Sequence, residues 1–164
     1  MSEAYEELIG GELIERRPPP SPHEMLVDRL HRLVARSLPA NSTLRLLAPR
    51  TELELGATCR LRPDLAVVRA KADLADPAGV QLYLVAEVLL PGDHHVDTVL
   101  KKQLWADARL PRLWMVDPRY LNVEIYGRGE YGFTLFEILA NHHTLTDPHL
   151  PGLSCSMDEL FATL

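Results

Sequence analysis

Cysteine is scarce in this sequence, and positive charge is not in excess. Only Cys59 and Cys155 are present, far apart and outside any CxxC motif, so we expect two reduced thiols in the core of a cytoplasmic protein. The formal net charge of −6 gives no indication of a nonspecific binder of polyanions. Any contact with nucleic acid must therefore use a local basic surface or a metal ion.

Long apolar runs are absent as well. The longest, near QLYLVAEVLL at residues 81–90, is too short to cross a bilayer, and the acidic start MSEAYEELIG has no apolar signal segment. We therefore expect no membrane association and a cytoplasmic location. The 164 residues, 46% of them hydrophobic, suit one domain with a buried core. Because no repeat or linker divides the chain, we predict a single domain over residues 1–164.

The N-terminal part predicts a hairpin followed by a helix. A Gly-Gly pair separates two short apolar stretches in ELIGGELIERR, residues 7–17, which is typical of a hairpin. Ser21 suits a helix N-cap, Pro22 the first helical position, and Glu24 the far side of a capping box. We predict an amphipathic helix from there to about Ser37. The RPPPSP segment also resembles a polyproline ligand, but it runs directly into this helix start.

The remainder predicts short strands around one central helix. Strand-like segments cover residues 43–55, 64–70, 81–90 and 112–117, and a hairpin over 122–139 turns at Gly127 to Gly129. A helix over about 96–109 has an apolar side made of Val96, Val99, Leu100, Leu104 and Ala108. A short helix is expected within 156–164. The strand, helix and strand at 81–117 form a βαβ unit. The fold class is therefore α/β (α+β), with a mixed sheet and few helices.

Two acidic residues are predicted to face each other on neighbouring strands. If the strands at 64–70 and 81–90 pair antiparallel about a turn between Ala75 and Asp76, Asp64 lies directly opposite Glu87, with Cβ atoms roughly 5 Å apart. Asp64 then shares its face with Ala66 and Val68, and Glu87 with Val85 and Tyr83. Two such carboxylates repel unless a cation such as Mg²⁺ lies between them. The alternative is a pair of acids at a frayed sheet end, neutralised by Arg62 or Arg69.

A lysine on the following helix can reach the same place. Leu89 follows Glu87 by two residues and occupies the position from which a lysine on the strand would point to the two acids. Lys101 can substitute for it, because Asp97 and Lys101 lie together at one edge of the apolar side of the helix. The alternative is an ordinary i,i+4 ion pair on a solvated helix face.

These motifs together resemble one family. RPD at 62–64, AEVLLP at 86–91, the pair Asp97 and Lys101, and PRLWMVD at 111–117 resemble the PD-(D/E)XK nuclease superfamily, and more closely the bacterial Uma family of restriction endonuclease-like proteins. The similarity begins at ELIGGELIE, continues through PPPSPHEMLVDRL and ends with LPGLSCSMDELF. It therefore covers nearly the whole chain.

The resemblance implies a restriction endonuclease-like core, a mixed central sheet flanked by helices, and a nuclease site. By position the catalytic residues are Asp64, Glu87 and Lys101. Asp64, Glu87 and the backbone carbonyl of Val88 would hold Mg²⁺ or Mn²⁺, and the substrate would be DNA. Supporting residues are Asp97, which would orient Lys101, His23, which would contact phosphate or bond at the helix start, and Glu12 in the opening hairpin. Where family members often carry arginines, this chain has the neutral His94 and His95, which weaken phosphate contact.

We expect the Lys101 amine within about 4 Å of one of the two carboxylates, and Lys102 in solvent. Because cutting two strands needs two sites, we also expect a homodimer. A second hypothesis is a catalytically silent module of the same fold that binds DNA or protein; the net charge favours it and the complete set of site residues opposes it. A third is a metal-binding protein that uses DHHVD and His142, His143 and His149, although the adjacent histidines lack helical ligand spacing.

Overall fold

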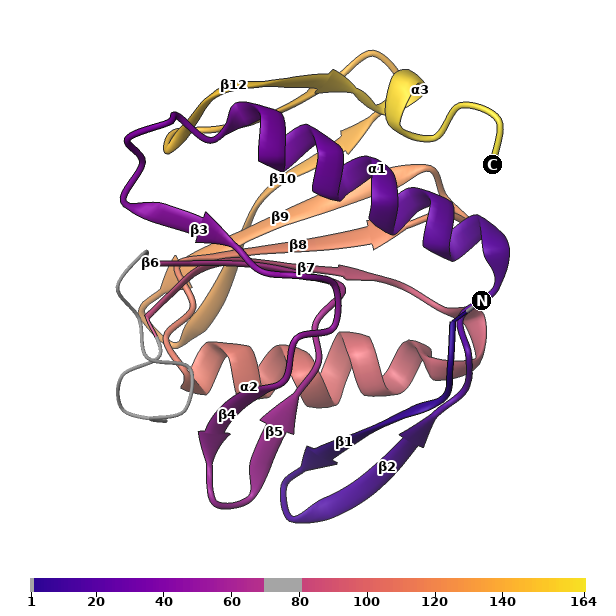
Figure 1. Cartoon of the computed structure of the whole chain (residues 1–164), viewed down its shortest axis with the longest axis vertical. Coiled ribbons are helices and arrows are strands. Elements are labelled where there is room, and N and C mark those ends of the chain that lie inside the picture. The colour runs from indigo at the N-terminus through magenta and orange to yellow at the C-terminus, as the bar shows by residue number, and fades with distance from the viewer. Residues whose placement is uncertain (1, 70–80) are drawn as a thin grey trace.

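A six-stranded mixed sheet forms the centre of the molecule in the computed structural model, which describes residues 2–69 and 81–164 (Figure 1). Its strands are β3 (Leu44–Leu46), β6 (Leu65–Arg69), β7 (Leu82–Val88), β8 (Arg112–Asp117), β9 (Asn122–Gly129) and β10 (Gly132–Ala140). They lie in the order β10-β9-β8-β7-β6-β3. Only β7 and β8 are parallel, which is the pairing that a helical crossover between them produces.

Helices cover both faces of this sheet (Figure 1). Helix α1 (Ser21–Ser37) packs on one face. The crossover from β7 to β8 packs on the other face and consists of η1 (Pro91–Asp93), the π-helix η2 (Val96–Lys101) and α2 (Lys102–Asp107). The described chain contains no helix with the length and apolar character needed to cross a membrane.

Two smaller sheets complete the fold. The first has the order β2-β1-β5-β4 and is built from β1 (Tyr5–Ile9), β2 (Glu12–Arg16), β4 (Leu53–Gly56) and β5 (Cys59–Leu61). The second pairs β11 (Thr144–Asp147) with β12 (Leu150–Ser156), and the short helix α3 (Met157–Leu160) follows. Figure 1 shows the first sheet beyond α2 and the second beside α1, so they extend opposite sides of the central layer.

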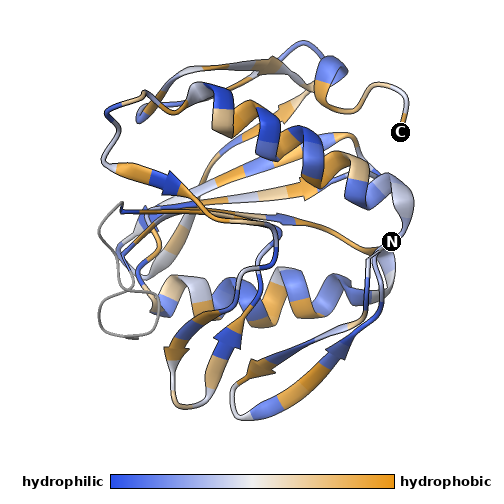
Figure 2. Ribbon diagram, viewed as in Figure 1, coloured by the Kyte–Doolittle hydropathy of each residue, from blue (hydrophilic) through white to orange (hydrophobic). Residues whose placement is uncertain are grey.

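A hydrophobic core lies on each side of the central sheet. Strand β7 supplies both, because Leu84 and Ala86 belong to the core under α1 while Val85 belongs to the core under α2. Apolar residues accordingly run along the central strands, whereas α1 alternates between apolar and polar positions (Figure 2). A strand that is buried on both faces reads as a continuous apolar run, which is the pattern seen at 81–90. Cys59 and Cys155 are buried and free, which confirms that they are not bridged.

The predicted strand over 43–55 is wrong as a single element. A turn at Ala48–Thr51 separates β3 from β4, and the two strands belong to different sheets. Arg50 in this turn has a left-handed φ of +56°, a conformation that side-chain-bearing residues seldom adopt. Its amide donates to the carbonyl of Pro63 at 3.0 Å, which fixes the turn against the start of β6.

The opening hairpin is confirmed, but the turn of the later hairpin is shifted. The β9–β10 turn is at Glu130 and Tyr131, and Gly127 lies within β9. A Cβ at Gly127 would come within 2.1 Å of the Phe136 ring on β10, so this glycine serves close packing between strands instead of a turn.

The predicted capping box at Ser21 and Glu24 is also wrong. The N-cap is Pro20, and no side chain caps α1. Glu24 instead pairs with Arg50 and accepts a hydrogen bond from Ser2 at 2.6 Å, because a guanidinium within reach is a stronger partner than a neutral amide.

Truncation of a residue in the middle of β7 should test this two-core arrangement. Leu84 is fully buried, so Leu84→Ala should lower the free energy of unfolding by about 2–5 kcal/mol through lost burial and a residual cavity. Leu13 is 54% exposed, and Leu13→Ala should change it by less than about 0.5 kcal/mol. Urea unfolding followed by circular dichroism measures both. Equal losses in the two variants would show that β7 is not central to the core.

Candidate active site

Asp64 and Glu87 come together where β6 begins and β7 ends. Leu65 pairs with Ala86, so Asp64, the residue before β6, stands opposite Glu87 in the predicted register. The turn predicted between Ala75 and Asp76 lies outside the described residues. Both acids are buried, and the backbone amide of Val88 donates to Asp64 Oδ2 at 2.9 Å. The carboxylate of Asp64 is thereby fixed on the end of the neighbouring strand.

One neighbour of Glu87 differs from the prediction. Val85 shares its core under α2, as expected. Tyr83 instead packs in the core under α1, because the β6–β7 register shifts between the pairs Val67–Leu84 and Val68–Leu82 and leaves Tyr83 as an extra residue. A bulge of this kind turns the side chain to the other face of the sheet.

Lys101 forms the link between the two parts of the site. Its Nζ lies 2.8 Å from Glu87 Oε1 and 2.9 Å from Glu7 Oε1, and its side chain is only 1% exposed. The expected distance of about 4 Å or less to a site carboxylate is confirmed. The alternative of a solvated Asp97–Lys101 pair is wrong, because both residues are buried. Lys102 is not free in solvent either, since its Nζ lies 3.8 Å from the centroid of the Tyr126 ring.

The opening hairpin supplies two charged residues that the sequence reasoning missed. Arg16 Nη1 donates to Glu7 Oε2 at 2.7 Å and Nη2 donates to Asp97 Oδ1 at 2.9 Å, while Nε donates to Asp93 Oδ2 at 3.2 Å. Asp97 therefore binds Arg16, and Lys101 is held by Glu7. Part of this could have been predicted from the sequence. Glu7 and Ile9 are two residues apart on β1, so their side chains point to the same, inward face.

Glu12 does not join the cluster, which corrects the expectation for this residue. It pairs with Ile9 next to the hairpin turn and is exposed, because the end of the hairpin extends beyond the body of the protein. Glu7, halfway along β1, is the glutamate of the hairpin that is buried in the cluster.

A second group of side chains surrounds Asp64 from α1 and the β3–β4 turn. His23 Nε2 lies 2.9 Å from the carbonyl oxygen of Val88 and 3.4 Å from Asp64 Oδ2. Arg50 Nη2 lies 3.2 Å from Asp64 Oδ1, and the same guanidinium pairs with Glu24. The left-handed turn at Arg50 directs this residue to the site, and it was not predicted because the sequence of this segment is typical of a strand.

The predicted apolar side of the crossover helix is confirmed in part, since Val96, Leu100 and Leu104 pack against the core under α2, and the π-helix η2 explains the residues that differ. Its wider turns change the rotational phase of the residues that follow, compared with a continuous α-helix. Trp105 is consequently fully buried and donates from Nε1 to Glu87 Oε1 at 3.0 Å. Val99, predicted to face the core, is 51% exposed, and Ala108 is exposed as well.

Negative charge exceeds positive charge within this buried cluster. Burial, followed by the neighbouring acids, raises the pKa of Glu87 to about 8 in spite of Lys101. Burial acts in the same direction on Asp64, but the hydrogen bond and charge of His23 and the charge of Arg50 outweigh it and lower the pKa of Asp64. Glu7, Glu87 and Asp97 outweigh burial at Lys101 and raise its pKa, so the amine stays protonated. Adjacent carboxyls with opposite pKa shifts are typical of catalytic sites.

The donor atoms suit a hard divalent ion more than zinc. Within residues 2–69 and 81–164, no three His, Cys, Asp or Glu side chains are grouped to hold one ion. Asp64, Glu87 and the Val88 carbonyl supply oxygen atoms, and Mg²⁺ commonly takes one or two carboxylates with water and phosphate. Burial and the neighbouring acids raise the pKa of Glu87, and a bound cation would act against both.

The remaining histidines do not form a metal site. His142 pairs with Asp158 at 2.8 Å between Nδ1 and Oδ2, the His143 ring accepts from the Ala140 amide, and the His149 ring packs against Tyr83. They lie in separate environments, which leaves the histidine-rich metal-binding hypothesis without support among the described residues.

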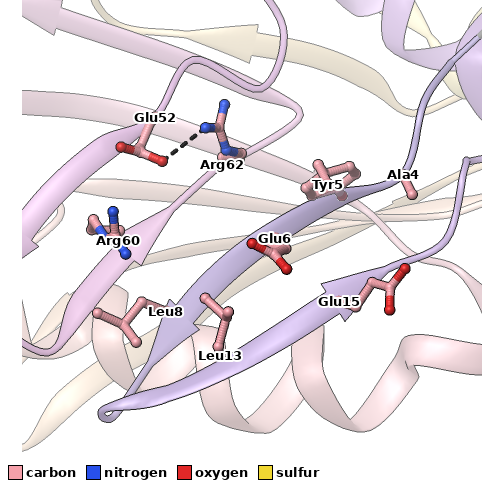
Figure 3. A pocket seen from close by; sticks show the side chains of 9 residues that line it. All are labelled: Ala4, Tyr5, Glu6, Leu8, Leu13, Glu15, Glu52, Arg60 and Arg62. Atoms are coloured by element: carbon pink, nitrogen blue, oxygen red, sulfur yellow. Dashed lines mark hydrogen bonds and ion pairs between the residues drawn. The ribbon is translucent and has the colours of Figure 1, made fainter.

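A groove of about 520 Å³ on the first small sheet lies beside the cluster. It is lined by residues of both charges, and Figure 3 shows Arg62 paired with Glu52 along one edge, with Glu6 and Glu15 on the opposite side. The guanidinium carbon of Arg50 lies 5.7 Å from the Tyr5 ring centroid. Burial, and then the charge of Asp64, raises the pKa of Tyr5. Tyr5 therefore separates this groove from the buried acids.

A family model named Uma2, described as "Putative restriction endonuclease", matches residues 2–158. The chain belongs to the Uma2 family. Its fold is similar to that of a crystal structure from Anabaena variabilis described as a putative nuclease belonging to DUF820. The TM-score is 0.75 at 17% sequence identity, over 96% of this chain and 89% of that chain. No curated protein matches the chain significantly. The likeness confirms the predicted fold class for this Uma2 protein, a mixed α+β fold with few helices.

Glu87→Gln should change how the stability of this Uma2 protein depends on pH. The pKa of Glu87 is about 8 in the folded protein against an ordinary 4.5, so between these values the folded state holds a proton that the unfolded chain has released. The contribution of Glu87 to wild-type stability therefore falls as the pH rises from about 4.5 to about 8. The variant lacks this contribution, and the difference between the two unfolding free energies should change by on the order of 5 kcal/mol across the range.

Urea unfolding without divalent metal at a series of pH values measures this effect. Glu12→Gln, at an exposed position, is the matched control and should follow the wild type. A constant difference between Glu87→Gln and wild type over pH 4–8 would contradict the raised pKa.

Proposed function

We propose that this protein hydrolyses phosphodiester bonds in DNA with the help of Mg²⁺ or Mn²⁺. The observation that carries the proposal is the register that sets Asp64 opposite Glu87 while Lys101 lies 2.8 Å from the Glu87 carboxylate. Membership of the Uma2 family supports nuclease activity in general. Because both strands of a duplex would need a site each, we further propose that it acts on duplex DNA as a homodimer.

Asp64, Glu87 and the Val88 carbonyl would hold the ion. When bound, such an ion lowers the pKa of a coordinated water and neutralises charge that develops on the phosphate. Asp64 is ready to bind because it is already ionised, while Glu87 must release its proton first. Trp105 donates to Glu87 and fixes the orientation of that carboxylate.

Lys101 would act as a cation and not as a general base. Its neighbours raise its pKa, so it has no lone pair to accept a proton at neutral pH. If Glu87 also bound a metal ion, it would neutralise less of the positive charge of Lys101. The remaining charge would then stabilise the oxygen atoms of the transition state. Glu7 keeps the ammonium in place at 2.9 Å, and Arg16 in turn holds Glu7, so both are positioning residues.

Arg50 is suited to contact the substrate. Its side chain is 15% exposed, unlike that of Lys101, and its guanidinium reaches Asp64 while it lies over the ring of Tyr5, which lines the groove. A guanidinium can bind two phosphate oxygen atoms at once. His23 would hold the Val88 carbonyl and Asp64 in register, because its ring lies within hydrogen-bonding distance of the former and close to the latter.

A second candidate is a nuclease-fold module that binds without cleaving. One observation favours it: Asp64 and Glu87 each already form an ion pair with a cation of the protein, Arg50 and Lys101 respectively. Metal binding separates the two candidates, since only the enzyme needs an ion at these acids.

Metal ions should stabilise the wild-type protein and not the site variants. A bound ligand at about 100 times its Kd raises the free energy of unfolding by about 2.7 kcal/mol. Titration with MnCl₂ or MgCl₂ should therefore raise the melting temperature of wild type and of Glu12→Gln, in which only an exposed carboxylate is lost. Asp64→Asn and Glu87→Gln should lose the increase. An equal increase in all four proteins would place any bound ion elsewhere.

Cleavage should depend on Lys101 and not on Lys102. Lys101→Met should reduce the rate of plasmid or oligonucleotide cleavage with Mn²⁺ by roughly 100-fold or more, since the cation aimed at the phosphate is removed. Lys102 stacks on Tyr126, outside the acid cluster, so Lys102→Met should cleave within a few-fold of wild type.

Because removal of a buried partner costs about 3–5 kcal/mol, Lys101→Met must first be shown to fold by circular dichroism. Lys101→Arg keeps the charge and provides a second variant with a misplaced cation, which should also be slow. An inactive Lys102→Met beside an active Lys101→Met would require the site to be redrawn.

A further inference from the structure

A second pocket with concentrated positive charge lies at the other end of the central sheet. Its volume is about 470 Å³, within the range of small-ligand sites. Its lining among the described residues includes Arg69, Arg112, Arg128, Tyr83, Phe136 and His149, and the nearest carboxylate is that of the buried Asp147. We call it the arginine pocket. Three arginines line it in a chain whose net charge is −6, and Arg128 Nε donates to the Arg109 carbonyl at 2.7 Å, so its Nη atoms are the ones that can face a ligand.

Strand topology brings these residues together. Arg69 ends β6, Tyr83 is near the start of β7, and Arg112 begins β8, so antiparallel and parallel pairing put all three at one sheet end. Glu87 lies four residues farther along β7, which corresponds to about 13 Å. The arginine pocket is thus separate from the acidic cluster.

The buried carboxylate of Asp147 fixes two of the residues that line the arginine pocket. Asp147 accepts from the Tyr83 hydroxyl at 2.6 Å and from the His149 amide at 2.9 Å. Arg112 Nε is 4.0 Å from Asp147 Oδ2, and the Arg112 side chain is 24% exposed. At this distance Asp147 attracts Arg112 without a close hydrogen bond, and the guanidinium remains accessible to an anion.

An exposed aromatic ring lies beside this guanidinium. Phe136 is 54% exposed, and its ring centroid is 5.2 Å from the Arg112 guanidinium carbon. It stands on the β10 bulge over Gly127, where any Cβ would collide with the ring. The ring is therefore held by strand geometry while much of it faces water, which is the arrangement on which a planar ligand can stack.

We propose that the arginine pocket binds a nucleotide unit, with the phosphate on Arg112 and Arg128 and the base on Phe136. Guanidinium groups bind phosphate through paired hydrogen bonds, and the ring adds a stacking surface that a bare phosphate would leave uncovered. A free mononucleotide and the end of a nucleic-acid strand both present this chemistry. The site goes beyond the proposed cleavage, because binding here needs neither metal nor Lys101.

Calorimetric titrations in EDTA test the proposal without the candidate active site. Thymidine 5′-monophosphate should bind the wild-type protein more tightly than thymidine or inorganic phosphate does. Arg128→Gln should weaken binding of the monophosphate about tenfold, by loss of a charge-assisted contact. Arg32→Gln removes an equally charged, 73% exposed side chain on α1 and should leave binding within twofold.

The aromatic contribution is tested on the same strand. Phe136→Ala should weaken the monophosphate by roughly tenfold and leave inorganic phosphate unchanged. Leu135→Ala, at a neighbouring 43% exposed residue, is its control and should bind as wild type does. A 5′-phosphorylated hexathymidylate that binds more tightly than the monophosphate identifies a strand end as the ligand; equal or weaker binding identifies a free nucleotide.

The proposal is overturned if thymidine 5′-monophosphate does not bind, or if Arg128→Gln and Phe136→Ala behave as their controls do. Failure of the proposed nuclease function is a different result: wild type would cleave no DNA with Mg²⁺ or Mn²⁺, while the titrations in EDTA would be unaffected.

Discussion

The ammonium of Lys101, buried between Glu7 and Glu87, is the interaction on which the arrangement of the site depends. It joins the opening hairpin, the crossover helix and the central strand β7 at one point. A buried cation is costly to desolvate, so all three elements must be in place before it is compensated. Arg16 is a second buried cation and pairs in the same way with Glu7 and Asp97. The hairpin is therefore held on the domain by charge pairing as well as by apolar contact, which defines its position more narrowly than packing alone.

This pairing leaves the cluster short of positive charge. Four buried carboxylates, those of Glu7, Asp64, Glu87 and Asp97, face the buried Arg16 and Lys101 and the partly exposed Arg50, and the buried His23 adds a further cation when it is protonated. Burial, and then the charges of the other acids, raise the pKa of Glu87 to about 8 although Lys101 acts against them. A site that keeps one proton in place of a missing cation is less stable at high pH than it would be with an added ion. The folded protein is thus less stable because of Glu87, the same carboxylate that the proposed reaction needs as a ligand for the ion.

The sequence predicted those features of the site that depend on local periodicity. The pairing of Asp64 with Glu87 follows from a constant index sum along two strands, and the preference for Lys101 over Lys102 follows from helical phase. Glu7 was missed in favour of Glu12 because the depth to which a hairpin is buried is a tertiary property. Arg50 was missed because a left-handed turn interrupts what reads as one strand. Trp105 was missed because the helix model assumed α-helical turns throughout, whereas η2 is a π-helix.

The net charge of the chain gives no indication of the arginine pocket. The chain as a whole repels polyanions, yet the central sheet separates its charges, with the acids at one end of β7 and three arginines at the other. The separation along the strand is about 13 Å. Glu87 also holds its proton at pH values below its pKa of about 8, so at neutral pH this carboxyl adds little repulsion to an anion in the arginine pocket. Sheet topology, by fixing which strand ends lie together, thus allows an acidic protein to present a basic surface where phosphate can bind.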